Sequence, residues 1–166
     1  STLAAIGIRD IEIVERGVDT QRFDPARRDQ ALRRSWGAGP GTPVFLYVGR
    51  LAAEKNLMLV ARAFNAVRAR LPGATMVFVG DGPQRATLER DCPGAIFAGM
   101  RRGDDLAAHF ASADVFLFPS LTETFGNVTI EAMASGLAVL AFDYAAAAQH
   151  MRHDISGSLA PFDDAD

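Results

Sequence analysis

The sequence predicts a doubly wound parallel α/β sheet, and two observations lead to this expectation. Short apolar runs that read as strands alternate along the chain with segments in which apolar residues recur at helical spacing. The runs at 44–48 and 75–79 are almost continuously apolar, as central parallel strands are when both faces are covered. A glycine follows each run directly, Gly49 and Gly80. Ligands bind at the carboxyl ends of strands in such sheets, so we expect the functional site at these turns.

Composition excludes several classes of protein. A length of 166 residues fits one domain with a sizeable core, and a formal net charge of −3 argues against a broad nucleic-acid-binding surface. Cys92 is the only cysteine, which excludes a disulfide framework or a cysteine metal cluster. No apolar run reaches membrane-spanning length, and no signal peptide is visible. Both ends look cut, so we expect residues 1–166 to be an excised piece of a longer protein.

The amino-terminal part is expected to precede the main sheet. Residues 1–10 are predicted to form a short helix or turn, and 11–14 a first strand. The arginine-rich stretch 26–36 is predicted to be a solvated basic helix, on which Leu32 and Trp36 form one apolar stripe because they are four residues apart. A membrane-surface helix is the alternative, which the small apolar face disfavours.

A strand at 44–48 is expected to lead through a loop into a helix. The apolar residues of this helix recur at helical spacing and are Leu57, Val60, Ala61, Phe64, Val67 and Leu71. Arg50 and Lys55 lie in the loop, at the carboxyl end of the strand. Two cations at this edge suit a diphosphate, because they would bind it and stabilise the charge that develops as it leaves. The alternative is that both are solvated surface residues.

The strand at 75–79 is followed by Gly80-Asp81-Gly82-Pro83. This loop has the first two glycines of a dinucleotide-binding fingerprint, but Arg85 stands in place of the third. Pro83 is expected in the first turn of a helix that runs to about Arg90.

A short strand at 95–99 is expected next, followed by a helix that Asp104 caps. The buried stripe of this helix is predicted to comprise Leu106, Phe110 and Ala113. His109 lies on the flank of the stripe and is predicted to be a surface residue rather than an acid–base group.

The next stretch reads as a strand end, a tight loop and a helix. The apolar run 115–118 is predicted to be a strand that Pro119 ends, because proline lacks the N–H that a ladder needs. Thr122 or Thr124 can cap the following helix, and Gly126 allows a ligand to approach the backbone closely.

Two carboxylates frame this loop. Glu123 precedes the helix, and Glu131 lies inside it on the same face as Asn127, four residues earlier. A helix N-terminus exposes unpaired N–H groups and a positive dipole end, which suit a phosphate. Carboxylates accept hydrogen bonds from the hydroxyls of a sugar or ribose. The stretch therefore indicates a nucleotide-sugar site.

Two further strands are expected at 137–141 and 157–160. His150, His153 and Asp154 lie between them but are not expected to bind a metal, because no second shell can be argued for them.

Four motifs together resemble the retaining GT-B glycosyltransferases of the GT4 type, the glycosyl transferases group 1. The motifs stand in the family's order, cover nearly the whole chain, and are Gly17-Val18-Asp19-x3-Phe23, Val48-Gly49-Arg50-Leu51-x3-Lys55-Asn56, Val79-Gly80-Asp81-Gly82-Pro83 and Pro119-Ser120-x2-Glu123-x-Phe125-Gly126-x4-Glu131-Ala132-x2-Ser135-Gly136. The chain departs from the family at 142–149, where alanines and Gln149 stand in place of paired glycines and a glutamate.

The resemblance implies that residues 1–166 are the carboxy-terminal, donor-binding Rossmann-like domain of a two-domain enzyme whose N-terminal acceptor domain is absent. The enzyme would move a hexosyl group from a nucleotide-diphospho-sugar to an acceptor glycan or glycolipid, in cell-envelope, glycolipid or polysaccharide synthesis. No cofactor, metal or nucleic acid is expected. The full-length protein would be cytoplasmic, with peripheral membrane association as an open option, and the isolated fragment would bind nucleotide weakly and be inactive.

The resemblance also assigns roles to residues. Arg50 and Lys55 are expected to hold the diphosphate, and Glu123 to accept hydrogen bonds from donor-sugar hydroxyls; these three are the expected catalytic residues. Glu131 is expected to read the ribose hydroxyls. The remaining expected donor-binding residues surround the phosphates, the sugar and the nucleobase, and are Gly49, Gly80, Met100, Arg101, Thr124, Phe125, Gly126 and Asn127.

Three alternatives stay open at this point. The broken glycine fingerprint disfavours a nicotinamide-dependent Rossmann domain. The spacing of Glu123 and Glu131 disfavours an inverting GT-B enzyme or an epimerase-type protein. A non-catalytic sugar-nucleotide-binding or interaction module is disfavoured, because a module that binds nothing has no need of these acids together with Arg50 and Lys55. The donor sugar, nucleobase, acceptor, linkage and oligomeric state are left open.

Overall fold

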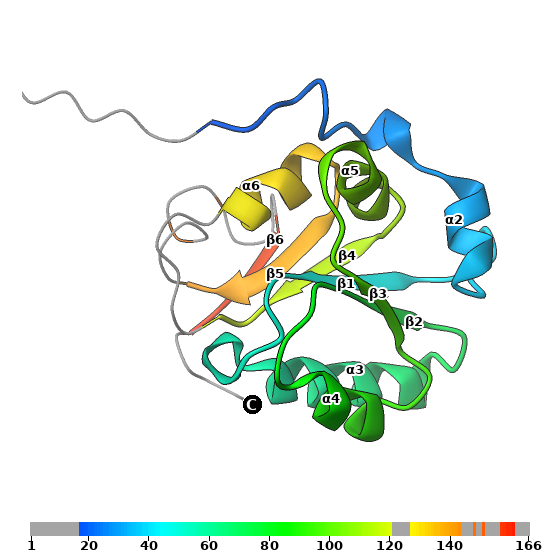
Figure 1. The fold of residues 1–166 in the computed structure, drawn as a ribbon, viewed down its shortest axis with the longest axis vertical. Coiled ribbons are helices and arrows are strands. Elements are labelled where there is room, and N and C mark those ends of the chain that lie inside the picture. Colours follow the sequence, from blue (N-terminus) through cyan, green and yellow to red (C-terminus); the bar gives the residue numbers. More distant parts are fainter. Residues whose placement is uncertain (1–16, 121–126, 144–147, 149–150, 152–156, 162–166) are drawn as a thin grey trace, which may run out of the picture.

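The computed structural model describes residues 17–120, 127–143, 148, 151 and 157–161, and the structural statements below concern these residues. Their strands form one parallel sheet in the order β3-β2-β1-β4-β5-β6 (Figure 1). The strands are β1 (Val44–Val48), β2 (Thr75–Val79), β3 (Ile96–Gly99), β4 (Val115–Phe118), β5 (Ala138–Phe142) and β6 (Gly157–Ala160). The direction of this order reverses between β1 and β4, the switch point at which doubly wound sheets bind ligands.

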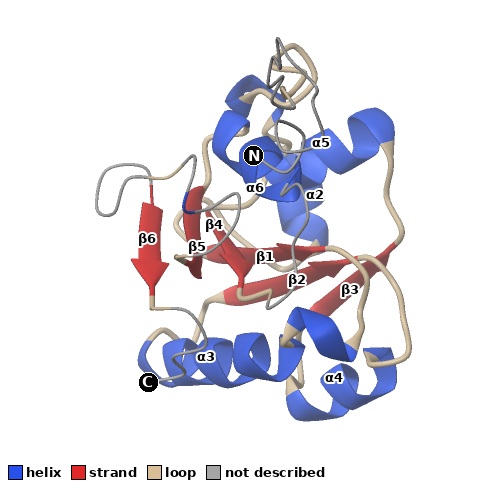
Figure 2. Cartoon of the chain, turned by 90° about the vertical axis from the view of Figure 1, so that its left-hand side faces the viewer, coloured by secondary structure: helices blue, strands red, loops and turns tan. Residues whose placement is uncertain are grey.

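Helices cover both faces of the sheet. One face carries α3 (Leu57–Arg70) and α4 (Arg85–Asp91), and the other carries α5 (Gly103–Ala111) and α6 (Asn127–Ala134) (Figure 2). The short helices η1 (Pro25–Arg27) and α2 (Gln30–Ser35) precede β1, and η2 (Ala53–Lys55) follows it. The predicted doubly wound parallel α/β fold is therefore confirmed. The helix and strand predicted before residue 15 lie outside the described residues.

The core contains aromatic rings from neighbouring strands that pack against one another. Tyr47 of β1 lies between Phe118 of β4 and Phe78 of β2, at centroid distances of 6.4 and 6.1 Å, and Phe78 stacks on Phe97 of β3 at 5.0 Å. All but Phe97 are buried, and this packing fixes β3, β2, β1 and β4 relative to one another.

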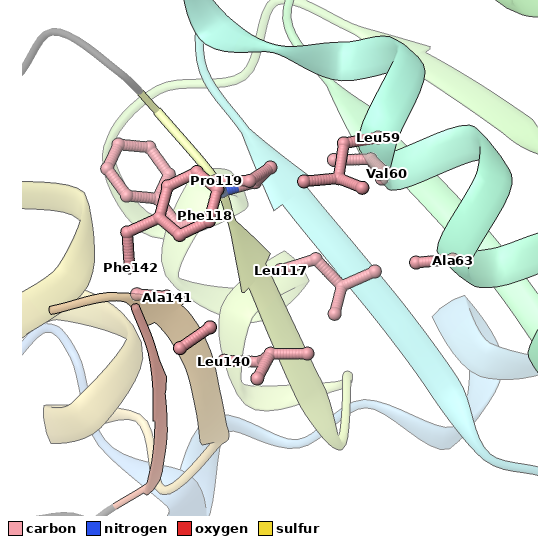
Figure 3. Close-up of a pocket in the computed structure, with 10 residues that line it drawn as sticks. Leu59, Val60, Ala63, Leu117, Phe118, Pro119, Leu140, Ala141 and Phe142 are labelled. Carbon is pink, nitrogen blue, oxygen red and sulfur yellow. The ribbon is translucent and has the colours of Figure 1, made fainter. Parts of the chain in front are cut away.

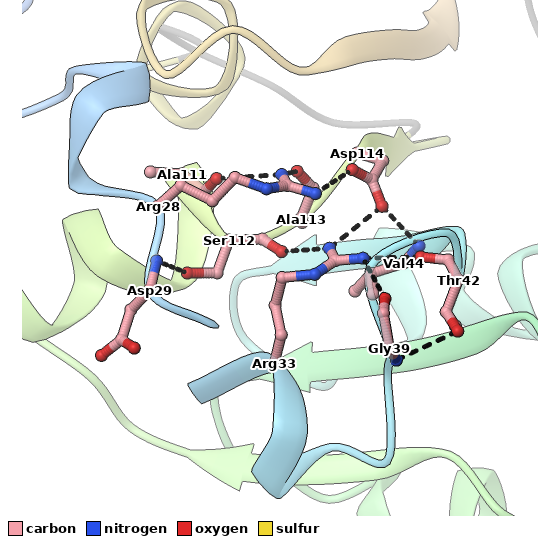
Figure 4. A network of polar contacts seen from close by, with 10 residues as sticks. All are labelled: Arg28, Asp29, Arg33, Gly39, Thr42, Val44, Ala111, Ser112, Ala113 and Asp114. Carbon is pink, nitrogen blue, oxygen red and sulfur yellow. Dashed lines mark hydrogen bonds and ion pairs between the residues drawn. The ribbon is translucent and has the colours of Figure 1, made fainter. Parts of the chain in front are cut away.

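The prediction of a solvated basic helix at 26–36 is wrong. The segment forms η1 and α2, and Arg33 is 1% exposed. Its guanidinium donates to Asp114 Oδ2 at 3.1 Å and to three backbone carbonyls, those of Gly39, Thr42 and Ser112 (Figure 4). A guanidinium can be buried where its N–H groups find acceptors; here four oxygens accept from Nη1 and Nη2, whereas the buried Nε has no hydrogen-bond partner among the described residues.

Asp114 collects further contacts at the same place. Its Oδ1 accepts from Arg28 at 2.6 Å, and its Oδ2 accepts from the Val44 N–H at 2.8 Å (Figure 4). Burial alone would raise the pKa of this carboxyl, but the hydrogen bonds from Arg28, Val44 and Arg33 outweigh it, and the pKa lies below its ordinary value. The network ties the amino-terminal segment to the starts of β1 and β4, at the edge of the sheet opposite to the carboxyl ends.

Four smaller expectations about the helices are also wrong. His109 is buried rather than at the surface, because Trp36 covers it at 5.5 Å and the Asp105 carbonyl lies 2.7 Å from its Nδ1. Asp104 does not cap α5; it lies in the first turn, where its exposed carboxylate pairs with Arg22 and Arg27. Pro83 precedes α4 and does not lie in its first turn. Leu71 follows the last residue of α3, and its side chain is half exposed rather than buried.

Candidate functional site

Backbone hydrogen bonds continue past the ends of the central strands and join their loops. The Gly49 N–H donates to the Val79 carbonyl at 3.0 Å, and the Leu51 N–H donates to the Asp81 carbonyl at 2.9 Å. The Gly80 N–H donates to the carbonyl of the last residue of β3, at 2.9 Å. The loops after β1 and β2 and the last residue of β3 are therefore joined at the carboxyl edge of the sheet.

Glycine is required where two of these loops touch. A Cβ atom on Gly80, whose φ is +137°, would lie 1.9 Å from the Gly49 carbonyl oxygen. A Cβ atom on Gly82 would lie 2.4 Å from the Leu51 carbonyl oxygen. Side chains are excluded there by backbone contact, so Gly80 has a packing role. The predicted contact between Gly80 and a donor stays a prediction.

Lys55 lies at the switch point of the sheet. It ends η2, and its Nζ donates to Ser120 Oγ at 3.3 Å. The same ammonium group lies 6.0 Å from the centroid of the Phe118 ring, at the end of β4. The loop after β1 and the end of β4 thus meet around one cation, as the prediction for Lys55 requires.

Arg50 lies on the same loop but is differently held. Its backbone carbonyl accepts a hydrogen bond from the buried Tyr47 hydroxyl at 3.2 Å, and its largely exposed guanidinium pairs with Glu54. A backbone hydrogen bond within Glu54 and the adjacent guanidinium hold the pKa of this carboxyl below its ordinary value. Arg50 therefore has an anionic partner already, which a diphosphate would have to replace.

Helix α6 presents two polar side chains that the described part of the chain leaves without a hydrogen-bond partner or a salt bridge. Asn127 is the first residue of the helix, and its Oδ1 is buried without a hydrogen-bond partner. Burial raises the pKa of the Glu131 carboxyl, one turn later. Half-buried polar groups without partners reduce stability, and they concentrate at sites that bind ligands. Both side chains are suited to a ligand with hydroxyl groups.

The other predicted site residues are less informative. Met100 follows β3 and is 63% exposed. The Arg101 guanidinium donates to the Ala98 carbonyl at 2.9 Å and to Asp105 at 3.2 Å, so it points back along its own loop and α5. The predicted site residues between β4 and α6, among them the catalytic candidate Glu123, lie outside the described residues and are Glu123, Thr124, Phe125 and Gly126.

The sequence analysis missed roles for Tyr47, Glu54 and Ser120. Tyr47 reads as one more apolar residue of a strand, although its hydroxyl needs a partner when buried. Glu54 stands four residues after Arg50 in a loop whose local helix the sequence does not reveal. Ser120 was visible in a motif, but its contact with Lys55 joins residues 65 positions apart and depends on the strand order.

The described residues give little support for a metal site, a cysteine nucleophile or a membrane-spanning helix. The described residues contain no group of three or more histidine, cysteine, aspartate or glutamate side chains that could hold a metal ion, and His150, His153 and Asp154 are not among them. Burial raises the pKa of the Cys92 thiol, which opposes a role as nucleophile. Among the helices that the structure describes, none has the length and apolar character to cross a membrane.

An apolar cavity of about 230 Å³ lies on the α3 face of the sheet, beside the ends of β4, β5 and β6 (Figure 3). Its lining includes Leu59 of α3, Leu117 of β4 and Leu140 of β5. None of the described residues that line it is charged, so this part of the lining lacks the polar groups that a nucleotide requires.

The chain is similar to proteins of one family. The family model described as glycosyl transferases group 1 matches residues 42–166. A GDP-mannose-dependent alpha-mannosyltransferase of Mycobacterium tuberculosis is 44% identical over 144 residues, 86% of this chain and 36% of that protein. The sulfoquinovosyl transferase SQD2 of Arabidopsis thaliana is 40% identical over 140 residues, 82% of this chain and 27% of that protein. The chain thus spans between about a quarter and just over a third of the length of these relatives.

A solved structure shows the same fold. The C-terminal domain of a glycosyl transferase group 1 family protein from Francisella tularensis superposes with a TM-score of 0.75, over 90% of this chain and 82% of that domain, at 23% identity. At this identity the likeness concerns the fold alone.

Proposed function

The chain belongs to the glycosyl transferases group 1, and we propose that it is the donor-binding domain of a glycosyltransferase that uses a nucleoside-diphosphate sugar. In this proposal residues 1–166 form the carboxy-terminal donor domain, and a separate N-terminal domain carries the acceptor site. The full-length enzyme would transfer a hexosyl group with retention of configuration to an acceptor glycan or glycolipid.

The observation that carries the proposal is the cation held at the switch point. Lys55 contacts Ser120 across the reversal between β1 and β4, and Arg50 lies on the same loop. A diphosphate bound at this edge would meet both cations, which would also stabilise it as the leaving group. Glu131 and Asn127, one helical turn apart on α6, would then accept or donate hydrogen bonds to ribose or sugar hydroxyls.

The name of one relative supports a proposal for the donor base and sugar. The mycobacterial protein that is 44% identical is named for its dependence on GDP-mannose. We therefore propose GDP-mannose as the donor, with Met100 and Arg101 beside the base. The departing phosphate would assist deprotonation of the acceptor, so no protein nucleophile is required. Acceptor binding and catalysis would need the N-terminal domain, and the 166-residue chain would bind nucleotide weakly and transfer nothing.

Calorimetric titration with GDP, UDP, ADP and oxidised nicotinamide dinucleotide tests the proposal. We expect GDP to bind most tightly and Glu131→Ala to weaken it, while Glu89→Ala, on the exposed side of α4, leaves the affinity unchanged. Tighter binding of the dinucleotide would overturn the proposed class of protein. Tighter binding of UDP or ADP would correct the base alone, and sugar transfer by the 166-residue chain would contradict the need for a second domain.

A further inference from the structure

The contact between Lys55 and Ser120 differs from an ordinary surface contact. Ser120 is 4% exposed and follows directly on β4 and Pro119, so the backbone at its side is fixed by the sheet. The Lys55 ammonium group contacts the serine Oγ at 3.3 Å and lies near the face of the Phe118 ring. A flexible side chain from the loop after β1 is thereby held by two groups of the next strand in the sheet.

We propose that Ser120 is a positioning residue, which together with Phe118 fixes the Lys55 ammonium ion where the diphosphate of the donor binds. This inference rests on the function proposed above and adds a specific role for a residue with no assigned one. Ser120 acts through Lys55 and is not itself the cation that neutralises the phosphates.

The physical reason is the cost of ordering a lysine. Its four-carbon stem has many rotamers, and binding of a phosphate by a mobile ammonium group must remove that freedom. A partner that orders the side chain before the ligand arrives moves this cost from binding to folding, and affinity rises accordingly. A hydroxyl and an aromatic face suit this purpose, because each attracts an ammonium ion and together they restrict where it lies.

The other cation of the site provides a contrast. The Arg50 guanidinium is exposed and paired with the carboxylate of Glu54, so its charge is compensated. The Lys55 ammonium group, by contrast, contacts a hydroxyl and a ring at the end of the neighbouring strand β4. We therefore expect the affinity contributed by the second phosphate of a diphosphate to depend on Lys55, and through it on Ser120.

The test compares GDP with GMP in titrations of the wild-type chain and of Ser120→Ala, Lys55→Ala and the double variant. Ser120→Ala is expected to weaken GDP binding roughly 5- to 10-fold, the scale of one typical hydrogen bond, and to change GMP binding less than about two-fold. In the Lys55→Ala background, Ser120→Ala should have no further effect, which is the signature of a residue that acts through another. Ser120→Thr keeps the hydroxyl and should restore most of the GDP affinity.

Ser112→Ala is the matched control for effects on folding. Ser112 is buried as Ser120 is, but its Oγ accepts from the Asp29 N–H at the amino-end edge of the sheet, far from the proposed site. It should lower the melting temperature without changing the ratio of GDP to GMP affinity.

Two results would overturn the inference alone, and a third would overturn the proposed function and the inference together. Equal losses of GDP and GMP affinity in Ser120→Ala, or an undiminished loss when Lys55 is already alanine, would show that Ser120 does not act through Lys55. A wild-type chain that binds no nucleotide, or binds GDP no better than GMP, would contradict the diphosphate site itself and the inference with it.

Discussion

Replacing Asp114 by asparagine should destabilise the domain strongly, although the residue lies away from the proposed site. The substitution keeps the shape of the side chain but removes the negative charge that faces Arg28 and the buried Arg33. An amide also presents N–H groups toward donors that need an acceptor. The Arg33 charge then remains buried with carbonyl oxygens as its only partners among the described residues.

The size of the effect follows from the burial of the two partners. Breaking a buried ion pair by removing one partner costs about 3–5 kcal/mol. The Asp114 side chain is 33% exposed, so water reaches this end of the pair, and we expect the lower limit, about 3 kcal/mol. For a domain of this length such a loss lowers the melting temperature by roughly 6–12 °C.

Urea unfolding measures this directly, because Trp36 is the only tryptophan and lies at the end of α2, next to Arg33. The midpoint should fall without a change in the slope of unfolding free energy against urea. Asp104→Asn is the matched control: Asp104 also pairs with two arginines, but its side chain is 73% exposed, and exposed pairs often contribute nothing measurable. Equal midpoints for the two variants would refute the reasoning.

Acidity provides an independent check on the same residue. The folded-state pKa of Asp114 is depressed, so its contribution to stability is present above the unfolded value, about 3.9 for aspartate, and is lost as the pH falls through the folded pKa. The difference in unfolding free energy between the wild type and Asp114→Asn should therefore be largest near neutral pH and decrease below about pH 4.

Three further substitutions test the site and its loops. Burial raises the folded-state pKa of Glu131, so the stability linked to its proton is present below about pH 4.3 and is lost as the pH rises through the folded pKa. Glu131→Gln should therefore raise the melting temperature at pH 7 but leave it unchanged at pH 4. The same substitution should weaken GDP binding. Glu54→Gln should strengthen GDP binding about two-fold at low salt, because it releases the Arg50 guanidinium, and this gain should disappear in 1 M NaCl. Glu89→Gln breaks a similar pair on α4 and should leave GDP binding unchanged. Weaker GDP binding by Glu54→Gln would contradict the idea that Glu54 and the diphosphate compete for Arg50. Gly80→Ala should lower the free energy of unfolding by about 3 kcal/mol or more, because the new Cβ atom would overlap a carbonyl oxygen. Gly73→Ala, whose Cβ atom would have no atom within 4 Å, should leave the urea midpoint near that of the wild type. Similar midpoints for the two variants would show that the loops can separate.

The fold followed from the sequence because its signals are local. The strand expected at 44–48 coincides with β1 and that at 75–79 with β2, since each is an apolar run ended by a glycine loop. The helix predicted from the spacing of Leu57 to Leu71 coincides with α3 except for its last residue.

The errors arose where a residue's surroundings come from distant parts of the chain. Arg33 looked like a solvated charge, because nothing near it in sequence shows that Ser112 and Asp114 supply acceptors. His109 looked exposed, because the helix pattern does not show that Trp36 covers its flank. The site divides in the same way: the loop that carries Lys55 was predictable from its motif, whereas its contact with Ser120 exists only through the neighbouring positions of β1 and β4.

The backbone contact between the loops after β1 and β2 also decides where this protein can be re-engineered. Residues 49–51 and 80–82 are joined by hydrogen bonds and by glycines that exclude any Cβ atom, so a random library directed there would yield mostly chains that do not fold. Met100, by contrast, is 63% exposed on the loop after β3. If the base lies beside Met100 and Arg101 as proposed above, a directed-evolution campaign for a new donor nucleobase should randomise residues 100–102 and leave the two joined loops untouched.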